Sequence, residues 1–134
     1  MKVVEYSSES YDTLRRKHLR QTGQTLDPDH TVVFLQHGQV VGYCVYYRNK
    51  TEVFVDWFQA QGHGKSAWSK LERAWTQSRV RRVRLNCSVD PTEPTSTVMK
   101  RINFWFGRGF KVHKIRYRKD HGPLLGLHKA LSAS

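Results

Sequence analysis

Two glycines followed by a lysine form the part of this sequence best suited to holding an anion. The stretch that contains them reads Gln59-Ala60-Gln61-Gly62-His63-Gly64-Lys65. Glycine lets the backbone turn tightly, and the first N–H groups of a helix have no partner inside that helix. A glycine turn at the start of a helix therefore presents backbone donors and a positive dipole to an anion. The stretch predicts a site for a phosphate or pyrophosphate group.

The residues on either side of this stretch predict the elements that the site needs. Residues 51–58 are rich in β-branched and aromatic side chains, which favours a strand. Apolar residues then recur at helical spacing and predict a helix over residues 65–78. Apolar and polar residues alternate over residues 80–89, which predicts a second strand. A strand, a helix and a strand in this order predict a right-handed crossover between two parallel strands.

The remaining segments predict a mixed α/β domain with a mostly antiparallel central sheet and flanking helices. Three strand patterns form an antiparallel meander leading into the strand at 51–58; they cover residues 3–6, 31–36 and 39–48. Amphipathic patterns predict one helix near residues 11–19 and another that starts at a Thr95 or Ser96 cap. Cations alternate with apolar residues over 111–119, and after a turn at Gly122-Pro123 an apolar stretch covers 124–131.

Length and composition set the class of protein. A chain of 134 residues with 38% hydrophobic residues fits a single globular domain over residues 1–134. No apolar run approaches the roughly 20 residues of a membrane helix, and the N-terminus lacks the pattern of a signal peptide. We therefore expect a cytoplasmic protein, with Cys44 and Cys87 as reduced core residues and no metal site.

The positive charge is concentrated in the second half of the chain. Residues 1–63 hold seven Lys and Arg against seven Asp and Glu, whereas residues 64–134 hold sixteen against four. The net charge of +12 therefore lies almost entirely beyond the glycine turn. Such asymmetry favours a polyanionic partner, which can be a nucleic acid, an acidic protein or a phosphate-rich cofactor. A basic surface that only aids solubility is the alternative.

Two motifs together resemble the GNAT superfamily of acetyl-CoA-dependent N-acetyltransferases. That family places Gln or Arg, two residues, Gly, one residue, then Gly or Ala between its fourth strand and third helix, and residues 59–64 fit this pattern. Its second landmark is a helix ending in an aromatic residue, followed after three residues by Gly-Phe, and residues 105–110 fit that frame. The resemblance covers nearly the whole chain, which is short for the family. It implies a GNAT-like fold, with a parallel splayed pair of strands at the cofactor site.

The resemblance also implies how acetyl-CoA binds as cosubstrate. Backbone N–H groups of about Gln61 to Lys65 would hold the pyrophosphate, and the strands at 51–58 and 83–89 would hold the pantetheine arm. A backbone N–H near Val55 to Trp57 would polarise the thioester carbonyl. The implied cofactor-binding residues are Val55, Trp57, Gln59, Gln61, Gly62, His63, Gly64 and Lys65.

The catalytic groups are less well defined by the resemblance. It implies direct attack by a primary amine, which must be neutral and so needs a base or a water chain. Glu52 and Asp56 share one face of the strand at 51–58, so either could serve, or both are solvated strand residues. Many members of the family use a tyrosine as the general acid that protonates the leaving thiolate, and Trp105 stands at the matching position here. Tyr117, His113 or solvent would have to supply this proton instead.

These departures leave two functions open. The first is an N-acetyltransferase that relies largely on positioning, with Glu52, Asp56 and Tyr117 as its candidate catalytic residues and the amine acceptor unnamed. The second is a basic nucleic-acid-binding protein on a GNAT-like scaffold with weak or no catalysis. The cations expected to contact phosphates in the second case are Arg79, Arg81, Arg82, Arg84, Lys114, Arg116, Arg118 and Lys119. The two functions can coexist.

Overall fold

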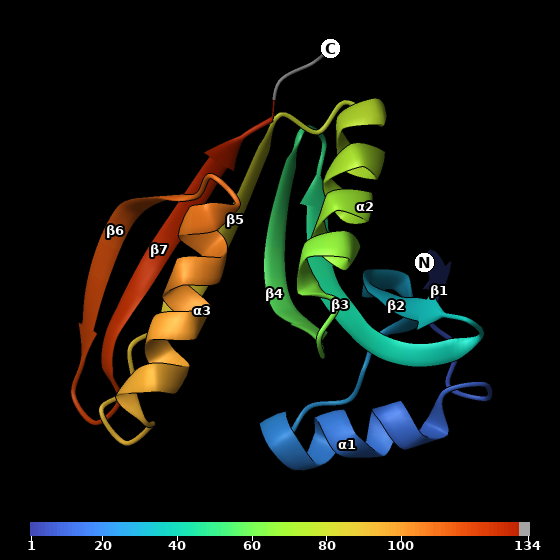
Figure 1. The fold of residues 1–134 in the computed structure, drawn as a ribbon, viewed down its shortest axis with the longest axis horizontal. Coiled ribbons are helices and arrows are strands. Elements are labelled where there is room, and N and C mark those ends of the chain that lie inside the picture. Colours follow the sequence, from blue (N-terminus) through green and yellow to red (C-terminus); the bar gives the residue numbers. More distant parts are fainter. Residues whose placement is uncertain (132–134) are drawn as a thin grey trace. The chain divides into compact units, whose positions relative to one another are not determined.

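The computed structural model describes residues 1–131 (Figure 1). They form two compact units, one made of residues 1–47 and 55–78 and the other of residues 48–54 and 79–131. Strand β4 (Glu52–Ala60) contributes its first three residues to the second unit and the rest to the first. The strand order is β1-β2-β3-β4 in the first unit and β4-β5-β7-β6 in the second, with β4–β5 as the parallel pair. The predicted fold class, a mostly antiparallel mixed sheet with helices, is confirmed.

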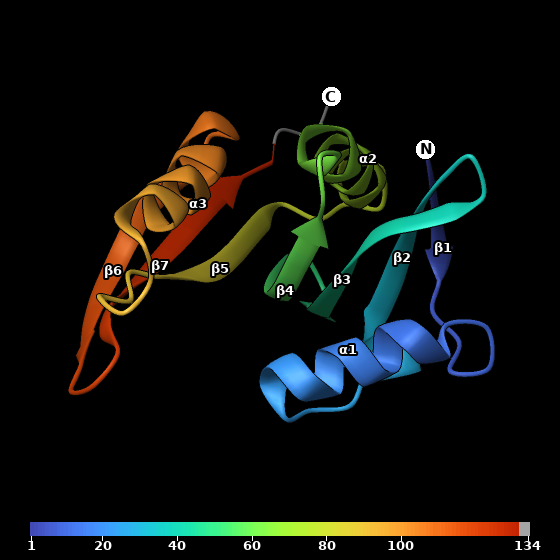
Figure 2. The same ribbon diagram turned by 60° about the horizontal axis from the view of Figure 1, so that its bottom comes forward.

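The first unit is an antiparallel meander with a helix on each face. Its elements are β1 (Lys2–Glu5), α1 (Asp12–Thr22), a short 3-10 turn (Pro28–His30), β2 (Thr31–Gln36), β3 (Gln39–Asn49), most of β4, and α2 (Gly64–Gln77). β1 pairs with β2, and β2 with β3, in antiparallel register, as the sequence predicted. Figure 2 shows α1 and α2 on opposite sides of these strands.

Alternation along the strands explains how both helices are held. On the α1 face, Tyr43 is 1% exposed and its ring packs edge-on against His18 of α1. On the α2 face, the Phe58 ring packs edge-on against Trp68, which in turn contacts Trp75 about two turns later. Because successive strand residues point to opposite faces, one sheet supplies both cores.

The second unit is a three-stranded antiparallel sheet, joined by the start of β4, with one helix. Its elements are β5 (Arg82–Ser88), α3 (Thr95–Gly107), β6 (Lys111–Arg118) and β7 (Gly122–Ala130). α3 lies over one face of the strands (Figure 1). Arg101 of α3 ties the helix to the end of β5, because its Nη1 donates to the Ser88 carbonyl at 2.9 Å and to Glu93 at 3.0 Å. Trp105 and Phe110, the aromatic residues of the 105–110 motif, pack edge-on against each other in the core of the second unit.

Some local predictions were wrong at the ends of elements. Pro94 occupies the N-cap position of α3, so neither Thr95 nor Ser96 caps the helix, and the Pro94 carbonyl accepts from the backbone N–H groups that follow. Gly122 and Pro123 belong to β7 itself and not to a turn before it.

Cys44 and Cys87 are free and buried, as predicted, and burial raises the pKa of both thiols. No helix in residues 1–131 is long and apolar enough to span a membrane.

Candidate functional site

The glycine stretch forms a short turn between β4 and α2. β4 continues through Gln59 and Ala60, so the turn proper is residues 61–63. The Gln61 N–H donates to the Val41 carbonyl of β3 at 3.1 Å, which anchors the turn to the neighbouring strand. Gly62 has a φ of 70°, in the left-handed region that favours glycine. A Cβ at Gly62 would meet no atom within 4 Å, so the space above the turn is open.

The first turn of α2 leaves a set of backbone donors without acceptors. His63 is the N-cap, and its side chain does not bond to the helix. The first bond of the helix runs from the Ala67 N–H to the His63 carbonyl at 2.9 Å. The N–H groups of Gly64, Lys65 and Ser66 therefore have no acceptor within the described residues. Three backbone donors without acceptors at the positive end of a helix are the feature on which the predicted anion site rests.

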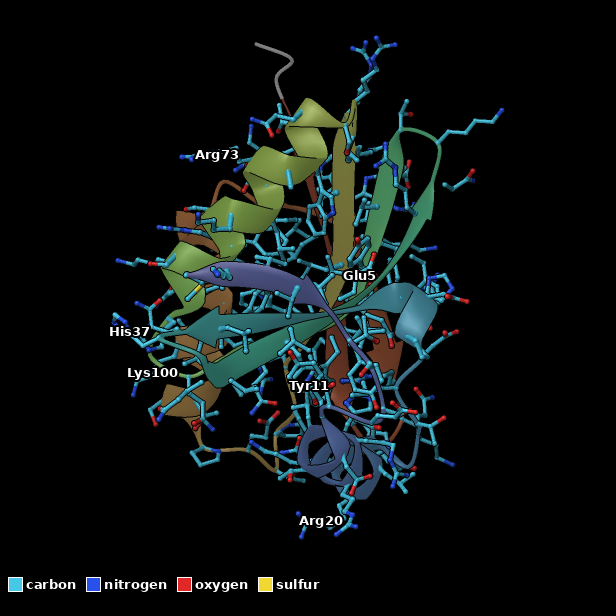
Figure 3. The ribbon with its side chains drawn as sticks, turned by 90° about the vertical axis from the view of Figure 1, so that its right-hand side faces the viewer. Glu5, Tyr11, Arg20, His37, Arg73 and Lys100 are labelled. Atoms are coloured by element: carbon cyan, nitrogen blue, oxygen red, sulfur yellow. The ribbon has the colours of Figure 1, made fainter. Side chains whose placement is uncertain are left out.

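Cations and hydroxyl groups extend this anion site along α2. A shallow hollow of about 320 Å³ lies over the first turns of the helix and is lined by Lys65, Ser66, Ser69, Lys70 and Arg73. Arg73 points outward from the helix (Figure 3). No carboxylate lines the hollow, so its potential is positive. Among the residues that line this hollow, the sequence prediction named only Lys65. Ser69 lies four residues further on, and helical spacing would have placed it on the same face as Lys65.

The end of β4 is held close to β3 by a glycine. A Cβ on Gly42 of β3 would collide with the carbonyl of Gln59 and the Cα of Ala60, so only glycine fits there. Beside this contact the side-chain Oε1 of Gln59 is buried and has no hydrogen-bond donor within the described residues. A buried acceptor without a donor next to the turn fits a site completed by a ligand N–H.

Val55 and Trp57 have their side chains in the core of the first unit. Val55 is 4% exposed, and the Trp57 ring packs edge-on against His18 with 5.4 Å between the centroids. A contact of Val55 with a ligand must therefore use its backbone, which is the role that the resemblance implies for both residues, whereas Trp57 is only partly buried. His63 is half-buried in the turn.

The two candidate carboxylates on β4 differ in their surroundings. Glu52, in the second unit, forms an ion pair with Arg84 of β5, with 2.7 Å between Oε1 and Nε. Asp56, in the first unit, is exposed and forms no hydrogen bond or ion pair within the described residues. The unit that contains the glycine turn therefore also contains the unengaged carboxylate.

The candidate acid Tyr117 lies on β6 in the second unit, with 82% of its surface exposed. Its hydroxyl has no partner within the described residues. Trp105, at the family's tyrosine position, is only 7% exposed and packs between Phe104 and Phe110. Trp105 is therefore a core residue of this unit.

A buried histidine was not singled out by the sequence. His18 of α1 is 3% exposed, and its Nδ1 lies 2.7 Å from the Tyr43 hydroxyl. Burial lowers the pKa of His18, an effect that Asp56 partly opposes, and burial raises the pKa of Tyr43 to about 12. At neutral pH the imidazole is therefore neutral, and it shares a buried hydrogen bond with the Tyr43 hydroxyl. Only the helical spacing of residue 18 could have indicated its burial.

The fold has close structural relatives despite low sequence identity. No protein-family model matches the sequence, and no curated protein is similar to it. Ard1 from Thermoplasma volcanium is 17% identical, with a TM-score of 0.74 over 98% of this chain and 97% of its own. Ribosomal-protein-alanine N-acetyltransferase from Brucella melitensis is 15% identical, with a TM-score of 0.66 over 98% and 100%. An aminoglycoside 6'-N-acetyltransferase complexed with coenzyme A is 14% identical, with a TM-score of 0.71 over 98% of each chain.

These relatives define the class of fold to which the chain belongs. Each aligns over nearly its full length, and two of the three, those from Brucella melitensis and the coenzyme A complex, are N-acetyltransferases by name. The chain has the GNAT fold, so the fold implied by the resemblance of residues 59–64 and 105–110 is confirmed.

Proposed function

We propose that this protein is an N-acetyltransferase that uses acetyl-CoA and a primary amine. The observation that carries the proposal is the row of free N–H groups on Gly64, Lys65 and Ser66, next to a hollow with three cations. Two relatives of this fold support it, because they are named as N-acetyltransferases and one of them is a coenzyme A complex. Fold alone does not determine activity, so the site has to carry the argument.

The residues of the first unit fit the phosphates of acetyl-CoA. The N–H groups of the first turn of α2 would hold the pyrophosphate, and Gly62 leaves the approach open. Lys70 and Arg73 would meet the remaining phosphate along the helix. Acetyl-CoA supplies a thioester, whose acyl carbon forms a bond to the amine nitrogen as the bond to sulfur breaks.

Asp56 is the proposed base of the reaction. An ammonium group must lose its proton before the nitrogen can attack, and a free carboxylate can accept that proton directly or through water. Asp56 is exposed and unengaged, whereas Glu52 is held by Arg84. Tyr117 is the proposed donor of a proton to the departing thiolate, and replacing it with Phe tests that role.

Calorimetric titration with acetyl-CoA tests the proposal. We expect saturable one-site binding, and Lys65→Glu should weaken it about tenfold or more, because it replaces a charge-assisted contact with repulsion. Arg20→Glu is the matched control: Arg20 is an exposed cation of the same unit, at the end of α1 (Figure 3). No binding by the wild type, or equal losses in the two variants, would refute the proposed cofactor site. Thiol release in a screen of amines then tests the transfer itself.

A further inference from the structure

Nearly all of the net charge belongs to the second unit. Residues 48–54 and 79–134 contain fifteen Lys and Arg against four Asp and Glu, whereas the first unit contains eight against seven. The second unit therefore carries +11 of the net charge of +12. An excess of this size in one small unit attracts polyanions. This attraction weakens as the salt concentration rises, because salt screens the charges.

The strand pairing gathers these cations on one face of the sheet. Residues paired across antiparallel strands point to the same side, and β7 pairs with β5 on one edge and with β6 on the other. Buried residues of β5 alternate with exposed ones, and the exposed set includes Arg84 and Asn86. The paired rows of this open face are Arg84–His128–Lys111, Asn86–Gly126–Lys114 and Ser88–Leu124–Arg116.

A bulge completes this arrangement. The register of β6 shifts between Val112 and Lys114, so Lys111 and Lys114 pair with His128 and Gly126, which lie two residues apart on β7. Strict alternation would have sent Lys111 and Lys114 to opposite faces. The bulge instead adds Lys111 to the side that carries Lys114 and Arg116.

The charges of this face are largely uncompensated. Lys111, Lys114 and Arg116 form no ion pair within the described residues. Arg84 is the member that has a carboxylate partner, Glu52. Arg82 donates from Nη2 to His128 Nδ1 at 3.0 Å, so that imidazole is neutral, in keeping with a pKa lowered by burial and by nearby cations. Burying these groups against another cationic or apolar surface would be costly.

The centre of the face is hollow and has an apolar part. Gly126 has no side chain there, and a hollow of about 140 Å³ opens between Asn86 and Lys114. Its lining also includes Phe54, from the start of β4, and Leu124. Proteins that bind single-stranded nucleic acid combine rows of cations with an aromatic side chain on which a base can stack.

We propose that this open face of β5, β7 and β6 binds single-stranded nucleic acid. Arg82, Arg84, Lys114 and Arg116 contact phosphates, and Phe54 offers a stacking surface for a base in the central hollow. The occupant is a nucleic acid and not an acidic peptide, because carboxylates alone would leave the apolar part of the hollow empty. The proposed surface lies entirely within the second unit. It does not depend on acetyl transfer.

Fluorescence anisotropy with a labelled oligothymidylate tests the proposal. On single strands each phosphate contact contributes about −0.7 to the slope of log affinity against log salt, so the double variant Lys114→Gln/Arg116→Gln should lower the steepness by about 1.4. The matched control Lys100→Gln/Arg108→Gln removes two cations of the same unit from α3 and its C-terminal end, and should leave the slope nearly unchanged. Phe54→Leu keeps every charge and should weaken binding several-fold with the slope retained.

Three results would overturn the proposal. They are absence of binding at low salt, an equal change of slope in both double variants, and displacement of the oligonucleotide by polyglutamate of equal charge. Calorimetry with acetyl-CoA on the double variant Lys114→Gln/Arg116→Gln separates the two sites, since binding of the cosubstrate should be unaffected. A loss of acetyl-CoA binding in Lys65→Glu with the oligonucleotide affinity retained would show the same independence from the other side.

Discussion

The Glu52 carboxylate lies 2.7 Å from the Nε of Arg84, so one of the two candidate bases on β4 is already bound to a guanidinium. The pair joins two residues that the sequence suggested for different functions, one for proton transfer and one for phosphate contact. The ion pair engages the Glu52 carboxylate and the Arg84 guanidinium at the same time. It therefore affects both proposed activities.

For acetyl transfer, the pair leaves Asp56 as the proposed base. We expect Asp56→Asn to lower kcat by about 10²- to 10⁴-fold, the usual contribution of a general base. Glu52→Gln should lower it by much less, because that carboxylate is not available to a substrate. The measurement is steady-state thiol release with a competent amine. A larger loss in Glu52→Gln than in Asp56→Asn would contradict the assignment.

For nucleic-acid binding, removing Glu52 should help. Glu52→Gln frees the guanidinium of Arg84 and removes a negative charge next to the open face of the second unit. We expect tighter oligonucleotide binding and a salt slope steeper by up to about 0.7, the value of one more phosphate contact. Anisotropy titrations at several salt concentrations measure both quantities. Unchanged or weaker binding would show that Arg84 does not contact phosphate.

Gly42 should be essential for the position of the turn. A methyl group there would collide with the backbone of Gln59 and Ala60, so Gly42→Ala should destabilise the protein by about 1–3 kcal/mol and weaken acetyl-CoA binding. Gly107→Ala at the end of α3 is the control, since a Cβ there meets no atom within 4 Å. Urea unfolding gives the stabilities. If both substitutions cost the same, close packing of β3 on β4 is not what fixes the turn.

The buried His18 should make stability depend on pH. Its pKa in the folded protein lies below the ordinary value of 6.5, because burial disfavours the charged ring. Stability from this group is fully present above pH 6.5 and is lost as the pH falls from there toward the folded pKa, because the unfolded chain takes up the proton first. Thermal melts across this range should show the decline in the wild type and a weaker one in His18→Leu. Parallel declines would rule out His18 as the source.

Local patterns were sufficient for much of the fold. Period-two and helical spacing predicted the strands and helices, and the glycine turn with the Trp105–Phe110 landmark indicated the GNAT fold. These features depend on neighbours in sequence, which is why the sequence reveals them. The ends of elements were less predictable, since Pro94 took the cap position that two hydroxyl residues next to it seemed suited to fill.

Contacts between distant segments were beyond these patterns. The Glu52–Arg84 pair exists because β4 and β5 are neighbours in the sheet, and the contact of His18 with Tyr43 joins residues 25 apart. The gathering of Lys111 with Lys114 depends on a bulge that strict alternation does not anticipate. Simple alternation would have divided the cations of β6 between two faces, and so it could not define the basic surface.

The most direct test of the central claim is an amide proton–nitrogen correlation spectrum recorded during titration with acetyl-CoA. The claim is that the free N–H groups at the start of α2 hold the phosphates of the cosubstrate. The largest shifts should then fall on Gly62, Gly64, Lys65 and Ser66, and coenzyme A without the acetyl group should shift the same amides. Saturating acetyl-CoA that leaves these four amides unmoved, or shifts only amides elsewhere in the chain, would contradict the account.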